Sequence, residues 1–339
     1  MKIELNSDQL QISDVASQFL AQELPLRRLR ELADDQSASL AIDQGVWRTC
    51  AEMGWFALGV PESRGGVGFG PVEEYALFRE LGRHLAPGPY TSTVTAGWLF
   101  VSNKDDANAA RVFDGSLRVG LVVEDLVIDA EPGGLALRFG PDGCSIHPVE
   151  DLDPIASVDP SVRLARANLG SAIATSTDPM ILARARVLVA AQEVGVALAV
   201  RDLSVEYAKE RHQFGKPIGT FQAVKHRCSD MATRVHAAHA QTLFAAMHVA
   251  RRSPESTFHA AAAKLVASNA AMSNTADNVQ NHGAIGFTVE HDAGLYARRA
   301  HMYEYALGGH AIAAPDVLTP SRHQFEGLAD EPADWFSAG

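Results

Sequence analysis

Hydrophobic and polar positions divide the chain into three stretches. Over residues 7–85, apolar residues recur at helical spacing among charged ones, and a proline with four glycines at 61–70 indicates a loop. Over residues 115–169, short runs of Val, Ile and Leu alternate with Gly, Pro and Asp, which predicts four to six short strands. From Asp178 onward, long apolar stripes return at spacings of three and four. The pattern predicts an α+β protein that is mainly α.

The last stretch predicts four long helices. Asp178 can cap the first of them, and Pro179 suits its first helical position, so a helix of about 30 residues should follow. Long helices joined by short turns favour an antiparallel four-helix bundle. The other three helices are expected at about 220–252, 254–282 and 292–307.

These patterns predict four segments. They are an N-terminal helical domain (1–114), a shortened central β domain (115–177), a C-terminal four-helix bundle (178–325) and an acidic tail (326–339). The tail carries four acids and no Lys or Arg, which is typical of a solvated end.

Composition excludes several classes of function. The 339 residues are 47% hydrophobic, enough for large cores. Acids outnumber bases 41 to 29, and a net charge of −12 argues against nucleic-acid or membrane partners, because both need a positive surface. No run approaches the roughly 18 apolar residues of a membrane span, and the N-terminus lacks an apolar signal region. We therefore expect a cytoplasmic protein.

No metal site is expected. The three cysteines are far apart and lack C-x-x-C spacing, so neither a zinc site nor a disulfide framework is indicated. Diiron bundles need Glu-x-x-His pairs, and the sequence has none. His236 and His239 share a helical face without carboxylates, and we interpret them as surface or interface residues.

The stretch KERHQFGKPIGTFQAVK, residues 209–225, holds more chemistry than a turn between helices needs. Gly215, Pro217 and Gly219 suffice to end one helix and begin the next. An arginine here could complement the helix dipole or grip a pyrophosphate with its planar fork, and spacing alone leaves both open. Four residues remain unexplained by the turn: Arg211, Gln213, Phe214 and Gln222.

This stretch, opening the second bundle helix, resembles the signature of the acyl-CoA dehydrogenase family. Two further stretches resemble the family in the right order. GWFALGVPESRGGVGFG, followed by a helix ending in ELGR, resembles its N-terminal domain, and QNHGAIGFT (280–288) resembles its loop before the last helices. The resemblance spans nearly the whole chain.

The resemblance implies FAD as cofactor and α,β-dehydrogenation of an acyl-CoA thioester, in which a carboxylate takes the α-proton. It also implies that two loops contact the FAD of a neighbouring subunit. The expected cofactor-binding residues are Arg211, Gln213, Phe214, Gln222, Gln280, Asn281, His282, Gly283 and Ala284.

The sequence departs from the family at the flavin ring and at the base. Residues 115–169 lack the usual Thr-Glu-Pro segment, the Gly-Ser after it and the later strand with Trp, so this chain is not expected to hold the flavin ring by itself. The usual Tyr-Glu-Gly aligns with 305–307, where Ala306 replaces the base, and the alternative base position falls near Ala185. We therefore expect no catalytic residue in this chain.

Three other acids in the bundle could in principle replace the base. Glu304 lies two residues from the expected position, on a different helix face, and is a weak candidate. Glu193 and Glu206 are interpreted as solvated or interface acids.

These departures resemble the short subunits of actinobacterial α2β2 acyl-CoA dehydrogenases, which act with a longer partner on bulky substrates such as steroid side-chain acyl-CoA. The hypothesis is a subunit that completes the FAD site of that partner. The alternatives are a non-catalytic scaffold or regulatory homo-oligomer, and a self-sufficient dehydrogenase with a displaced base. A pure scaffold needs no pyrophosphate clamp, so Arg211, Gln222 and Gln280 favour the subunit.

Overall fold

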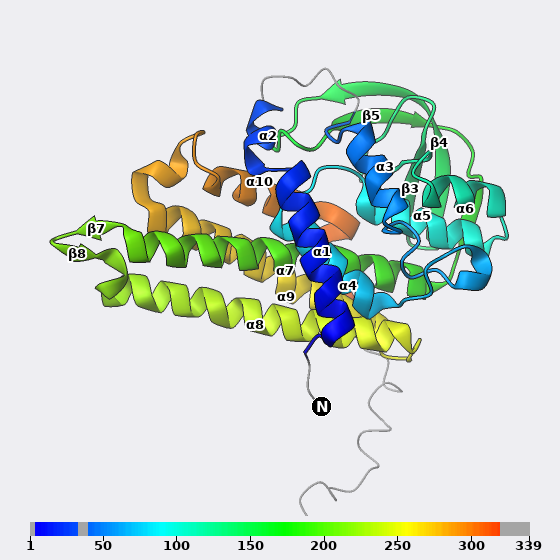
Figure 1. Cartoon of the computed structure of the whole chain (residues 1–339). Coiled ribbons are helices and arrows are strands. Elements are labelled where there is room, and N and C mark those ends of the chain that lie inside the picture. The colour runs from blue at the N-terminus through cyan, green and yellow to red at the C-terminus, as the bar shows by residue number, and fades with distance from the viewer. Residues whose placement is uncertain (1–3, 33–39, 319–339) are drawn as a thin grey trace, which may run out of the picture.

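The protein folds as helices, then a small β region, then a helical bundle, which confirms the predicted fold class (Figure 1). The computed structural model describes residues 4–32 and 40–318. The predicted acidic tail and the end of the predicted bundle, 319–325, lie outside the described residues. Within the described ranges, no helix is long and apolar enough to cross a bilayer.

The N-terminal part is a set of helices around a buried aromatic centre. Trp47 stacks on Phe56 with ring centroids 4.3 Å apart, and Tyr90 packs beside them. Asp43 caps the helix that carries Trp47 by accepting two backbone N–H groups. The elements are α1 (Ser7–Glu23), α2 (Leu26–Glu31), α3 (Gln44–Glu52), η1 (Glu62–Arg64), α4 (Pro71–Arg83), α5 (Tyr90–Ser102) and α6 (Asp106–Phe113).

The central sheet closes on itself through an additional pairing between β3 and β4. Its strand order is β3-β1-β2-β5-β4-β6, and β3 also pairs with β4; β1 and β3 are parallel and the other pairs are antiparallel. Five strands begin within 115–169, as expected, but β4 is 13 residues long, so the prediction of short strands is wrong there. The strands are β1 (Val119–Val123), β2 (Leu126–Ile128), β3 (Leu135–Gly140), β4 (Gly143–Ile155), β5 (Leu164–Leu169) and β6 (Ala174–Ser176).

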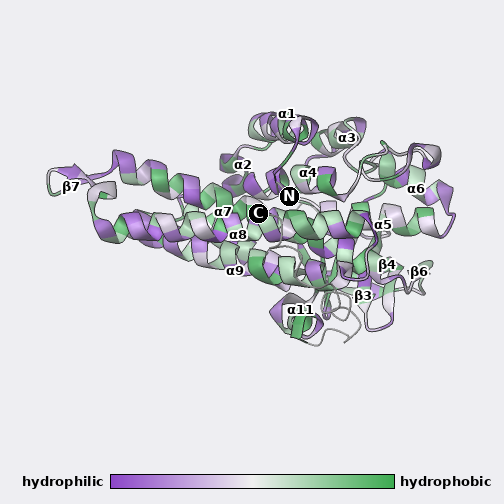
Figure 2. Ribbon diagram, turned by 90° about the horizontal axis from the view of Figure 1, so that it is seen from below, coloured by the Kyte–Doolittle hydropathy of each residue, from purple (hydrophilic) through white to green (hydrophobic). Residues whose placement is uncertain are grey.

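The bundle begins where the sequence places it. The Asp178 side chain accepts the Met180 N–H at 3.0 Å, and Pro179 opens a helix of 32 residues. Figure 2 shows the bundle from below, with its β7 end projecting beyond the other elements. The elements are α7 (Pro179–Glu210), β7 (His212–Gln213), β8 (Lys216–Pro217), η2 (Ile218–Thr220), α8 (Gln222–Ala250), α9 (Ser256–His282), η3 (Gly283–Phe287), α10 (Ala293–Tyr305), η4 (Ala306–Gly308) and α11 (Gly309–Leu318).

Two glycines let α4 of the N-terminal part approach α7 of the bundle closely. A Cβ atom at Gly82 would lie 1.9 Å from the Gln192 carbonyl oxygen, and one at Gly195 would lie 1.9 Å from the Arg79 carbonyl oxygen. Both distances are far inside van der Waals contact, so a larger residue would force these helices apart.

A buried arginine connects the three parts. Arg299 of α10 donates from Nε to the Asp159 carboxylate at 2.6 Å, and from Nη2 to the Ser161 hydroxyl, both between β4 and β5. Its Nη1 donates to the Ala86 carbonyl oxygen of the N-terminal part at 3.1 Å and to the Tyr303 hydroxyl at 3.2 Å. Arg299 and Asp159 are each 2% exposed.

We expect Arg299→Leu to lower the free energy of unfolding by about 3–5 kcal/mol, because it leaves the Asp159 charge buried without its partner. Arg298→Leu is the matched control, since Arg298 is more exposed and has no ion pair among the described residues. It should change stability by about 0.5 kcal/mol or less. Urea denaturation followed by circular dichroism measures both. Similar losses in the two variants would contradict the role of Arg299.

Candidate functional site

The turn between α7 and α8 is a two-residue hairpin. Its short strands, β7 and β8, are joined by Phe214 and Gly215, both at positive φ (54° and 78°). Such hairpin turns favour Asn and Gly, so an aromatic residue here is strained. The Phe214 side chain is 91% exposed and meets Phe221 edge-on at 6.0 Å. Phe214 therefore combines a strained backbone with an exposed ring.

The other predicted residues of this turn also face outward. Arg211 caps the end of α7: its N–H donates to the Tyr207 carbonyl at 2.8 Å, and its own carbonyl accepts the Ile218 N–H at 2.8 Å. The side chains of Arg211, Gln213 and Gln222 are exposed. They are therefore accessible to a cofactor or partner that approaches the end of the bundle.

The second predicted loop divides into an outward part and an inward part. Gln280, Gly283 and Ala284 are exposed, whereas Asn281 and His282 are buried. At Gly283, φ is 63° and the space around a Cβ is open, which leaves room for a group from outside.

The buried side chains of this loop already have partners within the chain. Asn281 accepts a hydrogen bond from Arg227 at 3.0 Å, and His282 donates from Nδ1 to the Asn278 carbonyl at 2.8 Å. Burial lowers the pKa of His282. Its ring packs on Tyr207 at 4.3 Å, which brings the two loops together at one end of the bundle.

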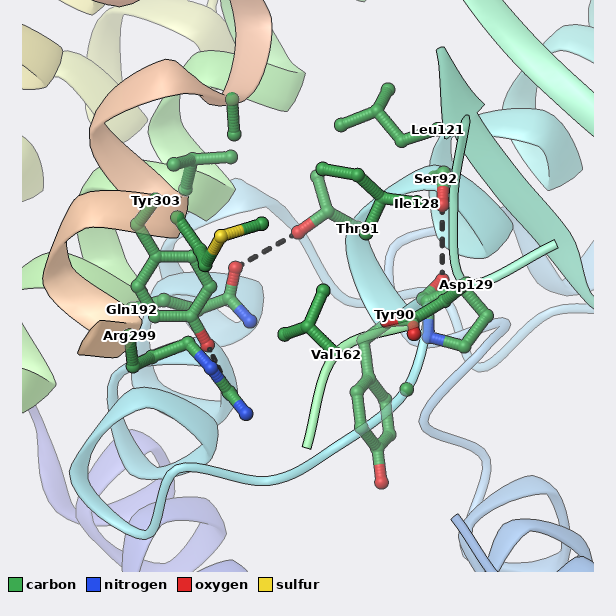
Figure 3. Close-up of a pocket in the computed structure, with 15 residues that line it drawn as sticks. Tyr90, Thr91, Ser92, Leu121, Ile128, Asp129, Val162, Gln192, Arg299 and Tyr303 are labelled. Atoms are coloured by element: carbon green, nitrogen blue, oxygen red, sulfur yellow. Dashed lines mark hydrogen bonds between the residues drawn. The ribbon is translucent and has the colours of Figure 1, made fainter. Parts of the chain in front are cut away.

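The position expected for the catalytic base lies in a different place, at the wall of a small cavity between the β region and the bundle (Figure 3). Ala306 lines this cavity and packs with Ala185, Val189 and Leu307 in one apolar cluster. The two positions expected for the base, Ala306 and the position near Ala185, therefore lie in one apolar cluster. The cavity measures about 70 Å³, whereas ligand pockets usually measure roughly 300–1,000 Å³.

Polar side chains also line this cavity. Gln192 accepts a hydrogen bond from Thr91 at 2.9 Å, and Asp129 accepts the Arg163 N–H at 2.8 Å. Burial raises the pKa of Asp129 to about 6, although hydrogen bonding and Arg299 oppose the shift. Sequence patterns did not single out Gln192, Asp129 or Arg299, because the chain brings them together from distant segments.

Glu304 does not line this cavity. Its side chain is 31% exposed and lies 3.9 Å from His301 on the outer side of α10. Glu206 is also exposed, as expected, and pairs with Lys209 at 2.6 Å.

The interpretation of Glu193 as a solvated or interface acid is wrong. It is fully buried, and its Oε1 accepts from Lys264 at 2.8 Å and from Ser268 at 2.6 Å. Burial raises the pKa of the Glu193 carboxyl, and Lys264 opposes that shift. One sequence pattern indicates that the partner of Glu193 is buried. Lys264 falls on the same helical face as Ala260, Ala267 and Ala271, all of which are buried.

Within the described ranges, no group of three or more His, Cys, Asp or Glu residues could hold a metal ion. His236 is exposed, and His239 is partly buried with Nδ1 against the Tyr75 hydroxyl.

The residues described above fit part of FAD only. The outward loops could meet its pyrophosphate and adenosine, but the cavity of about 70 Å³ is too small for a flavin ring.

Comparison with known proteins identifies the family of this chain. Residues 6–103 match the family described as acyl-CoA dehydrogenase, N-terminal domain, and residues 177–317 match acyl-CoA dehydrogenase, C-terminal domain. The acyl-CoA dehydrogenase IpdE2 of Mycobacterium tuberculosis is 37% identical over 274 residues, covering 76% of this chain and 81% of IpdE2. This chain belongs to the acyl-CoA dehydrogenase family. FadE34 of the same organism is 36% identical over 293 residues, covering 78% of this chain but 40% of FadE34.

Solved acyl-CoA dehydrogenase structures share the fold. A chain of a variant of the Tcur3481-Tcur3483 steroid ACAD aligns with a TM-score of 0.81 and 24% identity, covering 95% of this chain and 99% of that one. A chain of the ChsE4-ChsE5 complex from Mycobacterium tuberculosis aligns with a TM-score of 0.78 and 21% identity, covering 98% and 100%. At these identities the likeness establishes the fold.

We expect Asp129→Asn to stabilise this acyl-CoA dehydrogenase chain at pH 7 by about 1–3 kcal/mol and to have little effect near pH 4. The folded-state pKa of Asp129, about 6, lies above its usual value of 3.8, so the stability that the protonated carboxyl contributes is lost as pH rises from about 4 to 6. Asparagine can still accept the Arg163 N–H and tolerates the positive φ of 51°. Urea denaturation at both pH values, with Asp125→Asn as an exposed control, tests this. Equal effects at both pH values would contradict it.

Proposed function

We propose that this chain is a subunit of a flavin-dependent acyl-CoA dehydrogenase whose longer partner holds the flavin ring and the base. One observation carries the proposal: the cavity at the expected base position is about 70 Å³ and has Ala306 in its wall, while the signature loops face outward at the bundle end. A self-sufficient enzyme would need the reverse, an open cavity with a carboxylate in it.

In this proposal the outward loops complete the FAD site of the partner. FAD supplies the acceptor for the β-hydride of the acyl thioester. Arg211 offers a planar fork for a pyrophosphate, and such charge-assisted pairs are strong when they are removed from water. Gln213, Gln222 and Gln280 offer amide groups nearby, and Gly283 leaves its backbone open to contact. Asn281 and His282 would act indirectly, by holding the loop in place.

Exposed apolar side chains at the same end of the bundle support docking of another chain. Scattered exposed apolar residues are normal, but several at one end, rimmed by charge, are typical of an interface. The four residues are Phe214, Ile285, Phe287 and Val289, which are 91%, 48%, 80% and 72% exposed.

The relatives support the choice of partner and substrate class. Two of the structural neighbours, the Tcur3481-Tcur3483 steroid ACAD and the ChsE4-ChsE5 complex, are each named for two components. We therefore propose an α2β2 assembly acting on a CoA thioester with a bulky, steroid side-chain acyl group. The net charge of −12 and the lack of a spanning helix among described residues agree with a partner that is neither nucleic acid nor membrane.

We expect the purified chain alone to contain no FAD and to be inactive on CoA thioesters. Coexpressed with a longer member of the family that retains the base, it should form a complex containing FAD. Absorbance at the flavin bands and light scattering measure cofactor and assembly. Stoichiometric flavin on this chain alone would favour a self-sufficient dehydrogenase. A homo-oligomer that binds none of the longer chains would favour a scaffold protein.

In that complex, Arg211→Ala should weaken FAD binding by about 30-fold or more, because phosphate charge would lose a desolvated bidentate partner. Arg211→Lys keeps the charge but loses the fork, so it should recover only part of the affinity. Arg48→Ala, at an exposed position of α3, is the control and should leave the affinity unchanged. Unchanged affinity in both Arg211 variants, with the oligomer intact, would make Arg211 a helix-end residue only.

We expect Glu304→Gln to leave the activity of the complex within a few-fold, because the Glu304 carboxylate lies outside the cavity. Loss of a true general base typically costs about 10²- to 10⁴-fold in rate. Steady-state kinetics with a CoA thioester measures kcat, and circular dichroism checks folding. A collapse of kcat in a folded variant would identify Glu304 as catalytic.

A further inference from the structure

A second groove shares no lining residue with the cavity and carries two arginines and two histidines at its rim. It lies where α4, α7 and α8 pack together, away from the outward loops: Arg201 precedes Arg211 by about 15 Å along α7 at 1.5 Å per residue. Its volume is about 240 Å³. The lining residues are Arg79, Val194, Leu198, Arg201, Ala232, Val235, His236 and His239.

The charges of the two arginines are only partly used within the chain. Arg201 binds Asp202 through Nε and Nη2, at 2.9 and 2.5 Å, and its Nη1 has no hydrogen-bond partner among the described residues. Arg79 binds Glu80 in the same side-on manner and also donates to the Ser13 hydroxyl at 3.1 Å. Neither acid lines the groove, and none of the lining residues is acidic. Each guanidinium is ion-paired outside the groove, so the groove presents N–H donors and no carboxylate among its lining residues.

His239 adds a donor to this rim. Its Nδ1 contacts the hydroxyl of Tyr75, whose pKa is raised by burial, so the hydroxyl keeps its proton. When this hydroxyl donates to Nδ1, Nε2 carries the ring hydrogen. Burial lowers the pKa of His239 to about 4, and the charges of Arg79 and His236 act in the same direction. His239 therefore stays neutral, and the positive charge of Arg79 beside it attracts an anion.

The rest of the groove is apolar, with Val194, Leu198 and Val235 below the charged rim. We propose that this groove binds a small aliphatic carboxylate, whose anionic end lies between Arg79, Arg201 and His239 and whose chain lies on the apolar side. The volume suits a ligand smaller than most pocket ligands, which need roughly 300 Å³ or more. The site does not depend on the proposed cofactor function of the outward loops.

Calorimetry of the full chain with hexanoate tests this. We expect saturable binding with a dissociation constant of ~1 mM, the strength that a ligand of this size allows. Hexanol has the same tail without the charge and hexylamine has the opposite charge, so both should bind at least ~10-fold more weakly. In proton NMR, hexanoate should raise the pKa of His239 from its low value, because a nearby anion favours the imidazolium.

Arg201→Gln should weaken hexanoate binding at least ~5-fold, and Arg48→Gln on α3, with the same loss of charge, should not change it. Arg201 is 28% exposed and Asp202 keeps Arg83 as a partner, so the variant is expected to fold. No saturable binding, equal binding of hexanol, or equal effects of the two substitutions would each overturn the proposal. If self-association of the chain abolished hexanoate binding, that result would also overturn the proposal, and the groove would be a contact between copies.

Discussion

The arrangement of this protein depends on one buried guanidinium. Arg299 lies where the helical layer, the β region and the bundle meet, and its hydrogen bonds reach Ala86, Asp159 and Ser161. Apolar packing tolerates small sliding, but a charge removed from water is stable only while its partners stay in place. The three parts are therefore fixed relative to one another by directional bonds, and the cavity beside Arg299 has a defined shape.

A second buried ion pair, Lys264 with Glu193, holds the end of α10 next to the expected base position, Ala306. All three hydrogens of Lys264 are used: they reach Glu193, Ser268 and the Glu304 carbonyl oxygen, at 2.8, 2.7 and 3.2 Å. The last contact anchors the end of α10, directly before Ala306. The backbone beside Ala306 is therefore held by residues other than the side chain at position 306.

Sequence patterns predicted what is local and missed what is distant. Asp178 and its following proline specify the start of α7 within a few residues, so that prediction is confirmed. The pairs Arg299–Asp159 and Lys264–Glu193 join residues 140 and 71 positions apart, and periodicity carries no information about such partners. The outward placement of Arg211 and the inward placement of Asn281 likewise depend on packing at the bundle end. Their cofactor roles remain predictions.

The cavity and the hairpin differ in their effect on the stability of the folded chain. At the cavity, alanine at positions 185 and 306 avoids the cost of burying a carboxylate in an apolar cluster. At the hairpin, Phe214 keeps a strained backbone and an exposed ring, both unfavourable for the isolated chain. Features that cost stability persist where they serve a function. A strained, exposed turn at the bundle end, away from a cavity whose expected base position is alanine, agrees with the proposed subunit that acts through its outward loops.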